Sequence, residues 1–187
     1  MAGIHTPTGK VELYSPTLEK YGIDPLPYYE EPAYSPISTP ELAKEYPLIS
    51  VFGRRVLPFY HGANRQIPWL RELHREPTVE IHPRTGEELG IKDGEWVYIE
   101  TPHEKGRVKL KAVLTARVHP KVISAEPFWW FPESGGPEYG CFESNVNAIA
   151  SYDTPRDQVV GSTQIRGGLC KIYRVEGESV AEIQDSV

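Results

Sequence analysis

Short apolar runs separated by turn residues dominate the sequence from residue 47 onward. Residues 48–52, LISVF, are a largely apolar run between a proline and a glycine, with the length of a buried strand. Elsewhere apolar and polar residues alternate, as in strands with one face in the core, and the interval PHEKG joins two such segments into a hairpin. The predicted strands are residues 48–52, 78–82, 96–101, 107–115, 121–125 and 168–175. Many short strands indicate a mostly β fold of the sandwich or barrel kind.

Two short helices are predicted between these strands. A proline stands at the start of residues 68–74, where Trp69, Leu70 and Leu73 fall on one side that we expect to face the core. Residues 83–89 are predicted to form the second helix, which the following glycine can end.

The chain divides by composition into three parts. Residues 1–45 are rich in Pro and Tyr with little periodicity, and we interpret them as a linker or a strap, to which Val11 and Leu13 could add a short strand. Residues 46–175 are predicted to form one domain, because a chain of 187 residues suits one well-buried core. Residues 176–187 are predicted to be an acidic, frayed tail.

A basic cluster follows the first predicted strand, although the formal net charge of the chain is −6. Guanidinium groups match the oxygens of phosphate or carboxylate, and Gly53 lets the backbone approach such a ligand closely. The cluster therefore indicates an anion site, with a solvated basic surface as the alternative. Its members are Arg54, Arg55, Arg65, Arg71, Arg75, His61 and His74, opposed by Glu72. The acidic balance of the whole chain argues against a general nucleic-acid surface.

Several ordered motifs resemble those of one known family. They are GRR after the first strand, HGANR at 61–65, IPWLREL at 67–73 and PTVEIHPRTGEELGIKDGEWVYIETP at 77–102. With TPTGKVELYS at 6–15, WWFPE at 129–133 and SNVNAIA at 144–150, the similarity covers nearly the whole chain. The sequence resembles the C-terminal dinucleotide-binding domain of molybdopterin oxidoreductases, the dimethyl sulfoxide reductase family, and among them most of all the thiosulfate and polysulfide reductase branch.

This resemblance implies a fold, a cofactor and partners. The implied fold is a double-psi β-barrel of the aspartate-decarboxylase-like type with short helices. The implied cofactor is molybdopterin guanine dinucleotide, whose molybdenum or tungsten is held by the pterin and not by this chain. The implied partners are the N-terminal domains of the same oxidoreductase, joined through TPTGK after an added MAG, and an iron–sulfur electron-transfer subunit. We expect no contact with nucleic acid or with a membrane, and the location of the parent enzyme, periplasmic or cytoplasmic, stays open.

The resemblance also implies which residues contact the cofactor. Gly53, Arg54 and Arg55 would lie against the pyrophosphate and the pterin, where consecutive backbone N–H groups and a guanidinium supply donors. His61 and Arg65 match family positions, but Gly62 stands where the family often has Ser or Gln, so the side-chain hydrogen bond expected at that position is missing. A structural histidine is an equal alternative for His61. The full set of expected cofactor-binding residues is Gly53, Arg54, Arg55, His61, Arg65, Asn145, Asn147, Gln164 and Arg166.

The long glycine-rich stretch at residues 127–152 holds two of these residues. An amide offers both a donor and an acceptor, as a pterin or guanine edge requires, and Asn147 is the better family match. The alternative is that one Asn of the pair caps the following helical turn. Exposing Trp129, Trp130 and Phe131 together would be costly, so we expect at least two of them to be packed.

No catalytic motif of the GxSxG, HExxH, P-loop or GxGxxG type is present, and the six His residues are scattered. We therefore expect this chain to bind and orient a cofactor and to have no redox activity alone. Two alternatives compete with that expectation. One is a protein-interaction module that docks on the rest of the oxidoreductase. The other is a self-cleaving pyruvoyl decarboxylase relative, for which Gly161-Ser162 would be the cleaved dipeptide.

Overall fold

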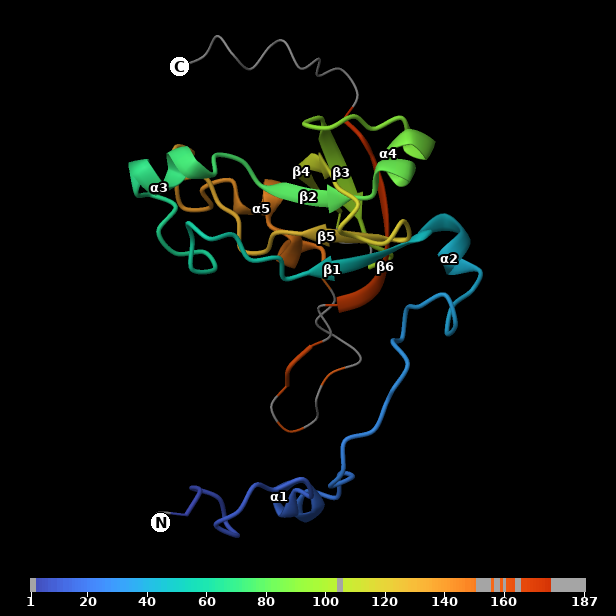
Figure 1. Ribbon diagram of the computed structural model, residues 1–187, viewed down its shortest axis with the longest axis vertical. Coiled ribbons are helices and arrows are strands. Elements are labelled where there is room, and N and C mark those ends of the chain that lie inside the picture. The colour runs from blue at the N-terminus through green and yellow to red at the C-terminus, as the bar shows by residue number, and fades with distance from the viewer. Residues whose placement is uncertain are drawn as a thin grey trace.

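Six strands close into a barrel in the computed structural model, which describes residues 3–103, 106–150, 156, 159, 161–163 and 166–175. Their order around the barrel is β1-β5-β2-β4-β3-β6 (Figure 1). The strands are β1 (Leu48–Phe52), β2 (Thr78–Ile81), β3 (Trp96–Glu100), β4 (Arg107–Leu114), β5 (Val122–Ala125) and β6 (Arg166–Arg174). All six predicted strands are present, with ends that agree to within two residues. The prediction of a mostly β, closed structure is confirmed.

Alternation along each strand produces the barrel core. In β3, Val97 and Ile99 are wholly buried while their neighbours are partly exposed, and Val108 and Leu110 of β4 repeat the pattern. Successive side chains of a strand point to opposite faces, so every second residue enters the interior. The buried cluster draws on all six strands and holds the strand ends in fixed relative positions.

The strand pairing has an internal two-fold symmetry. Exchanging β1 with β4, β2 with β5 and β3 with β6 converts β1/β5 into β2/β4 and β1/β6 into β3/β4, with the same directions, and leaves β2/β5 and β3/β6 unchanged. The two parallel pairs, β1/β5 and β2/β4, are therefore equivalent. The equivalent strands β5 and β2 are each followed by one residue and then a proline, in Glu126-Pro127 and in His82-Pro83.

The two equivalent ends of the barrel are covered differently. Helix α4 (Pro83–Leu89) begins directly after β2 and ends at Gly90 in the left-handed conformation, with φ of 66°. A Cβ on Gly86 would lie 2.8 Å from a Leu114 methyl carbon, so α4 packs closely on the end of β4. After β5 the chain runs instead as a loop, toward α3 (Pro68–Leu73) and α5 (Cys141–Ser144), which lie at the end opposite α4 (Figure 1). This end stays open, and a short 3₁₀ helix, η1 (Val146–Ala148), follows α5.

The N-terminal segment leads away from the barrel (Figure 1). It contains α1 (Pro16–Lys20), capped by the Ser15 side chain, and α2 (Leu42–Glu45), which lies directly before β1. Val11 and Leu13 are exposed and form no strand, so the expectation of an added strand there is wrong. Among the described residues, no strand pairs with this segment to bury those side chains. No helix in the described residues has the length and apolar character needed to cross a membrane.

Helix α3 is present, but its predicted burial is wrong. Trp69 is 69% exposed and Leu73 is 72% exposed, and Leu70 is half-buried. The helix lies at the edge of the open end rather than against the barrel interior (Figure 1). An amphipathic pattern shows which face of a helix is apolar, but it does not show what covers that face.

Candidate functional site

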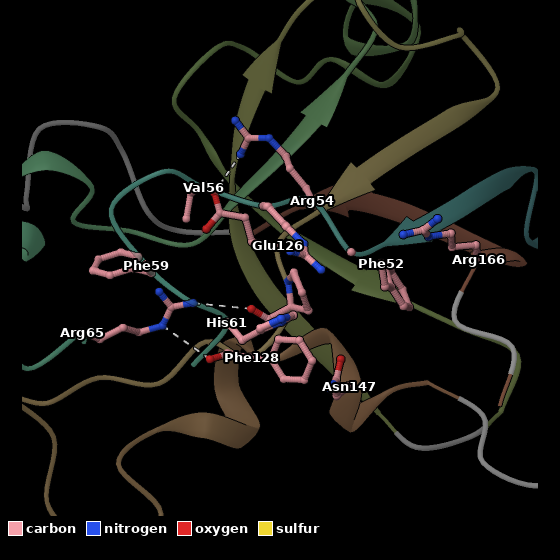
Figure 2. A pocket seen from close by; sticks show the side chains of 13 residues that line it. Phe52, Arg54, Val56, Phe59, His61, Arg65, Glu126, Phe128, Asn147 and Arg166 are labelled. Carbon is pink, nitrogen blue, oxygen red and sulfur yellow. Dashed lines mark hydrogen bonds and ion pairs between the residues drawn. The ribbon is translucent and has the colours of Figure 1, made fainter. Parts of the chain in front are cut away.

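A pocket lies where β1 and β5 end side by side. The strands are parallel, with Phe52 paired to Ala125, so the segments that follow them leave the barrel together. Between these segments is a cavity of about 170 Å³, drawn in Figure 2. It is lined by Phe52, Gly53, Arg54, Arg55, Val56, Phe59, His61, Arg65, Glu126, Pro127, Phe128, Asn147 and Arg166. Seven of the nine residues expected from the sequence are among these.

Gly53 and Arg166 form one edge of the pocket. Gly53 has φ of 155°, and a Cβ on it would lie 3.4 Å from the Arg166 Nη2 atom. The glycine thus lets the Arg166 guanidinium pack against the backbone just after β1. Arg166 reaches this place because it pairs with Val51 in the antiparallel β1/β6 ladder. It comes from a sequence position far from the basic cluster, so only barrel closure brings it to the pocket.

The side chain of Arg54 is held by the protein itself. Its Nη1 lies 2.7 Å from the Glu126 Oε1, and its Nε lies 3.2 Å from the Glu80 Oε1. The backbone N–H groups of Gly53 and Arg54 both donate to the Ala125 carbonyl, at 3.3 Å. The donors expected to receive a pyrophosphate here therefore have partners within the chain, and a ligand role for Arg54 stays a prediction.

Glu126 was not anticipated from the sequence. Its carboxylate is only 1% exposed and accepts hydrogen bonds from Arg54 at 2.7 Å and from the Thr78 hydroxyl at 2.5 Å. The His74 Nε2 lies 2.8 Å from the same oxygen. A single acidic residue after a strand carries no local signal of this role, because its partners lie on three other segments.

Arg65 is the most enclosed cation of the pocket. It is 1% exposed, and its guanidinium carbon lies 4.5 Å from the Phe59 ring centre and 4.2 Å from that of Trp129. Its Nε and Nη2 point toward the carbonyls of Phe128 and Pro127 at 3.4 and 3.5 Å, as Figure 2 shows. Its Nη1 is buried without a hydrogen-bond partner among the described residues. Burial lowers the pKa of Arg65 to about 10, which leaves it charged at neutral pH.

An aromatic cluster joins the two loops that line the pocket. Trp129, wholly buried, contacts both Arg65 and Arg71, whose guanidinium carbon lies 4.8 Å from the ring centre. Trp130 donates from Nε1 to the Gly62 carbonyl at 2.6 Å. The expectation that at least two residues of the Trp-Trp-Phe run are packed is confirmed. These contacts fix the loop after β5 against the loop that carries Arg65.

The remaining expected residues separate into three groups. His61 and Asn147 line the pocket, and the exposed His61 ring lies 5.1 Å from that of Phe128. Asn145 does not line it, since its Oδ1 accepts from the backbone N–H of Phe128 at 3.0 Å and of Asn147 at 3.1 Å. This is the capping arrangement that was the alternative for the Asn pair. Gln164 lies outside the described residues.

The side chains that line this pocket are suited to binding an anion. Arg55, Arg65 and Arg166 supply guanidinium groups, while Phe59 and Phe128 supply apolar walls suited to a ring. No group of three or more His, Cys, Asp or Glu side chains in the described part of the chain could hold a metal ion. The pocket can thus hold a phosphate-bearing ligand with a planar part.

Comparison with known proteins identifies the family. The family model of the molydopterin dinucleotide binding domain matches residues 49–166. The chain belongs to this family. Acetylene hydratase of Syntrophotalea acetylenica is 40% identical over 92% of this chain, and dopamine dehydroxylase of Eggerthella lenta is 38% identical over 95%. The solved acetylene hydratase from Pelobacter acetylenicus superimposes with a TM-score of 0.83 and 39% identity over 93% of this chain and 24% of its own.

Family membership confirms the resemblance drawn from the motifs. Thiosulfate reductase subunit PhsA of Salmonella typhimurium is 36% identical over 63% of this chain, in agreement with the expected branch. The chain spans 24% of the curated acetylene hydratase and 17% of the dopamine dehydroxylase that it matches. Membership implies a molybdopterin dinucleotide carrying molybdenum or tungsten, and in the matched relatives this domain is one part of a longer protein. Neither alternative from the sequence finds support in these matches.

The pocket residues fit such a cofactor. A pyrophosphate needs several rigidly held donors, and the buried Nη1 of Arg65 is a donor without a protein partner among the described residues. The adjoining Arg55 and Arg166 extend the same positive surface.

Proposed function

We propose that this chain binds and orients molybdopterin guanine dinucleotide as the C-terminal domain of a molybdenum or tungsten oxidoreductase. The observation that carries the proposal is the buried, unpartnered Nη1 of Arg65 in a pocket that Arg55 and Arg166 also line. An orphaned charged donor is costly unless a ligand accepts from it.

Different residues of this chain bind different parts of the cofactor. Arg65, held rigidly by Phe59 and Trp129, directs a charge-assisted hydrogen bond to a phosphate oxygen. Arg55 and Arg166 neutralise further phosphate charge at the exposed rim. Asn147 and His61 offer polar edges to the planar part of the ligand. When bound, the cofactor supplies the redox chemistry through its metal, and this chain contributes position and charge.

The finer description of the fold and of the partners belongs to the same proposal. The two-fold symmetry of the strand pairing, with two equivalent parallel pairs, supports a double-psi arrangement. We propose residues 1–45 as the linker to preceding domains and 46–175 as the cofactor-binding barrel, whereas the tail predicted at 176–187 lies outside the described residues. The exposed apolar face of α3 beside the pocket supports contact with those domains. An iron–sulfur subunit of the parent enzyme is a further proposed partner.

The test is an amide-resolved NMR titration of the chain with GDP, with ADP as the control. Shifts in residues 53–55, 61–65, 145–147 and 164–166, larger for GDP than for ADP, support the proposal. The variant Arg55→Gln should weaken GDP binding about tenfold, the effect of losing one charge-assisted hydrogen bond. Its matched control is Arg117→Gln, which removes the same charge from a side chain that is 78% exposed and lies outside the pocket. Equal effects of the two variants, or no GDP binding at millimolar concentration, would contradict the proposed site.

A further inference from the structure

The wall of the anion pocket contains a carboxylate that the binding of an anion does not require. Glu126 lines the cavity, yet its side chain is 1% exposed and cannot turn into solvent. Arg54, His74 and Thr78 hold it from the β1 loop, the end of α3 and β2 (Figure 2 shows Arg54 and Glu126). Its negative charge is therefore a fixed part of a site built from cations.

We propose that Glu126 is a specificity-determining residue, which lowers the preference of this cationic pocket for ligands that carry more phosphate charges than a dinucleotide pyrophosphate. This inference rests on the proposed function. Four guanidinium groups line the cavity, those of Arg54, Arg55, Arg65 and Arg166, and Glu126 pairs with the first of them. A dinucleotide pyrophosphate is a diester with about two negative charges, whereas GDP carries about three and GTP about four at neutral pH, since their terminal phosphates ionise further.

The fixed charge of Glu126 repels each additional negative charge of a ligand. Because the carboxylate is enclosed, water and salt screen it less than they screen a surface charge. The field of Glu126 acts within the pocket, since it favours the charged form of Arg65 against the effect of burial. At a separation on the order of 10 Å, even the full screening of bulk water leaves a repulsion that changes the affinity about twofold for each ligand charge, and we take this lower bound as the expected factor.

The variant Glu126→Gln tests this, because it removes the charge and keeps the size and an acceptor oxygen. We expect it to raise affinity about fourfold for diguanosine pyrophosphate, about eightfold for GDP and about sixteenfold for GTP, as the twofold factor per charge requires. A gain in affinity that grows with ligand charge cannot come from damage to the fold. Glu138→Gln is the matched control, since Glu138 is an exposed carboxylate on the same long loop and should leave all three affinities within twofold.

Each outcome of calorimetric titration with these three ligands has a meaning. If the unaltered chain binds the ligands, three results for Glu126→Gln would overturn this inference alone. They are a lower affinity, an unchanged affinity, or a gain in affinity that is the same for all three ligands. An unaltered chain that binds none of the ligands overturns the proposed function and this inference with it.

If the variant does not fold by circular dichroism, the double variant Arg54→Gln/Glu126→Gln decides, because it removes both members of the buried ion pair. Loss of the Arg54 charge lowers the affinity by the factor by which loss of the Glu126 charge raises it, so all three affinities should stay within about twofold of the unaltered chain. A loss of affinity that grows with ligand charge would overturn the inference.

Discussion

Replacing Arg54 by Met should destabilise the barrel strongly, because it strips a buried carboxylate of its main counter-charge. The Arg54 guanidinium lies 2.7 Å from Glu126, whose side chain is 1% exposed, and it also contacts Glu80 at 3.2 Å. Breaking a buried pair by removing one partner costs about 3–5 kcal/mol, since the remaining charge stays desolvated. His74 and Thr78 still contact Glu126 and offset part of this loss. We therefore expect a loss of about 3 kcal/mol in the free energy of unfolding.

Urea unfolding followed by circular dichroism measures that loss. The control is Arg55→Met at the neighbouring, exposed position, which should change the free energy of unfolding by less than about 0.5 kcal/mol. The two variants should separate stability from binding, because Arg55→Met weakens GDP binding more than it weakens the fold. A double-mutant cycle with Glu126→Gln should give a coupling energy of about 2 kcal/mol. A loss below about 1 kcal/mol for Arg54→Met, or additivity in the cycle, would refute the assigned pairing.

Two further predictions concern groups outside the pocket. Burial raises the pKa of Glu100, but hydrogen bonds from Lys171 and Tyr173 outweigh it and lower the pKa below its ordinary 4.5. The ionised carboxylate therefore stabilises the fold above pH 4.5 and loses this effect as pH falls through the folded-state pKa. Lys171→Met should cost about 1 kcal/mol at pH 7 and almost nothing at pH ~3, and a loss of the same size at both values would contradict this sign. Both cysteines are free thiols, and complete burial raises the pKa of Cys170. A thiol reagent at pH 8 should modify Cys141 but not Cys170 in the folded chain and both in urea, so rapid reaction of Cys170 without denaturant would be the contrary result.

The sequence by itself determined the strands, the basic cluster and the family. Strand positions follow from local alternation, which depends only on whether one face of each segment is buried. Gly53 and the arginines after β1 stand together in the sequence, so their association needs no tertiary information. The family motifs gave the cofactor class. The internal two-fold symmetry escaped sequence inspection because it lies in strand pairing, while the equivalent strands share few residues.

Only the tertiary structure decided which side chains face the ligand. Arg54 and Glu126 are separated by 72 residues, and they meet because β1 and β5 are neighbours in the closed barrel. The same closure brings Arg166 to Gly53, whereas the structure was needed to choose between the two roles of Asn145, which caps η1. The exposure of Trp69 could not be predicted from the sequence either. Periodicity shows which face of a helix is apolar, but it does not show whether another part of the protein packs on that face. The local sequence pattern thus assigns residues to helices and strands. Which distant charged residues meet depends on which strands are neighbours in the barrel.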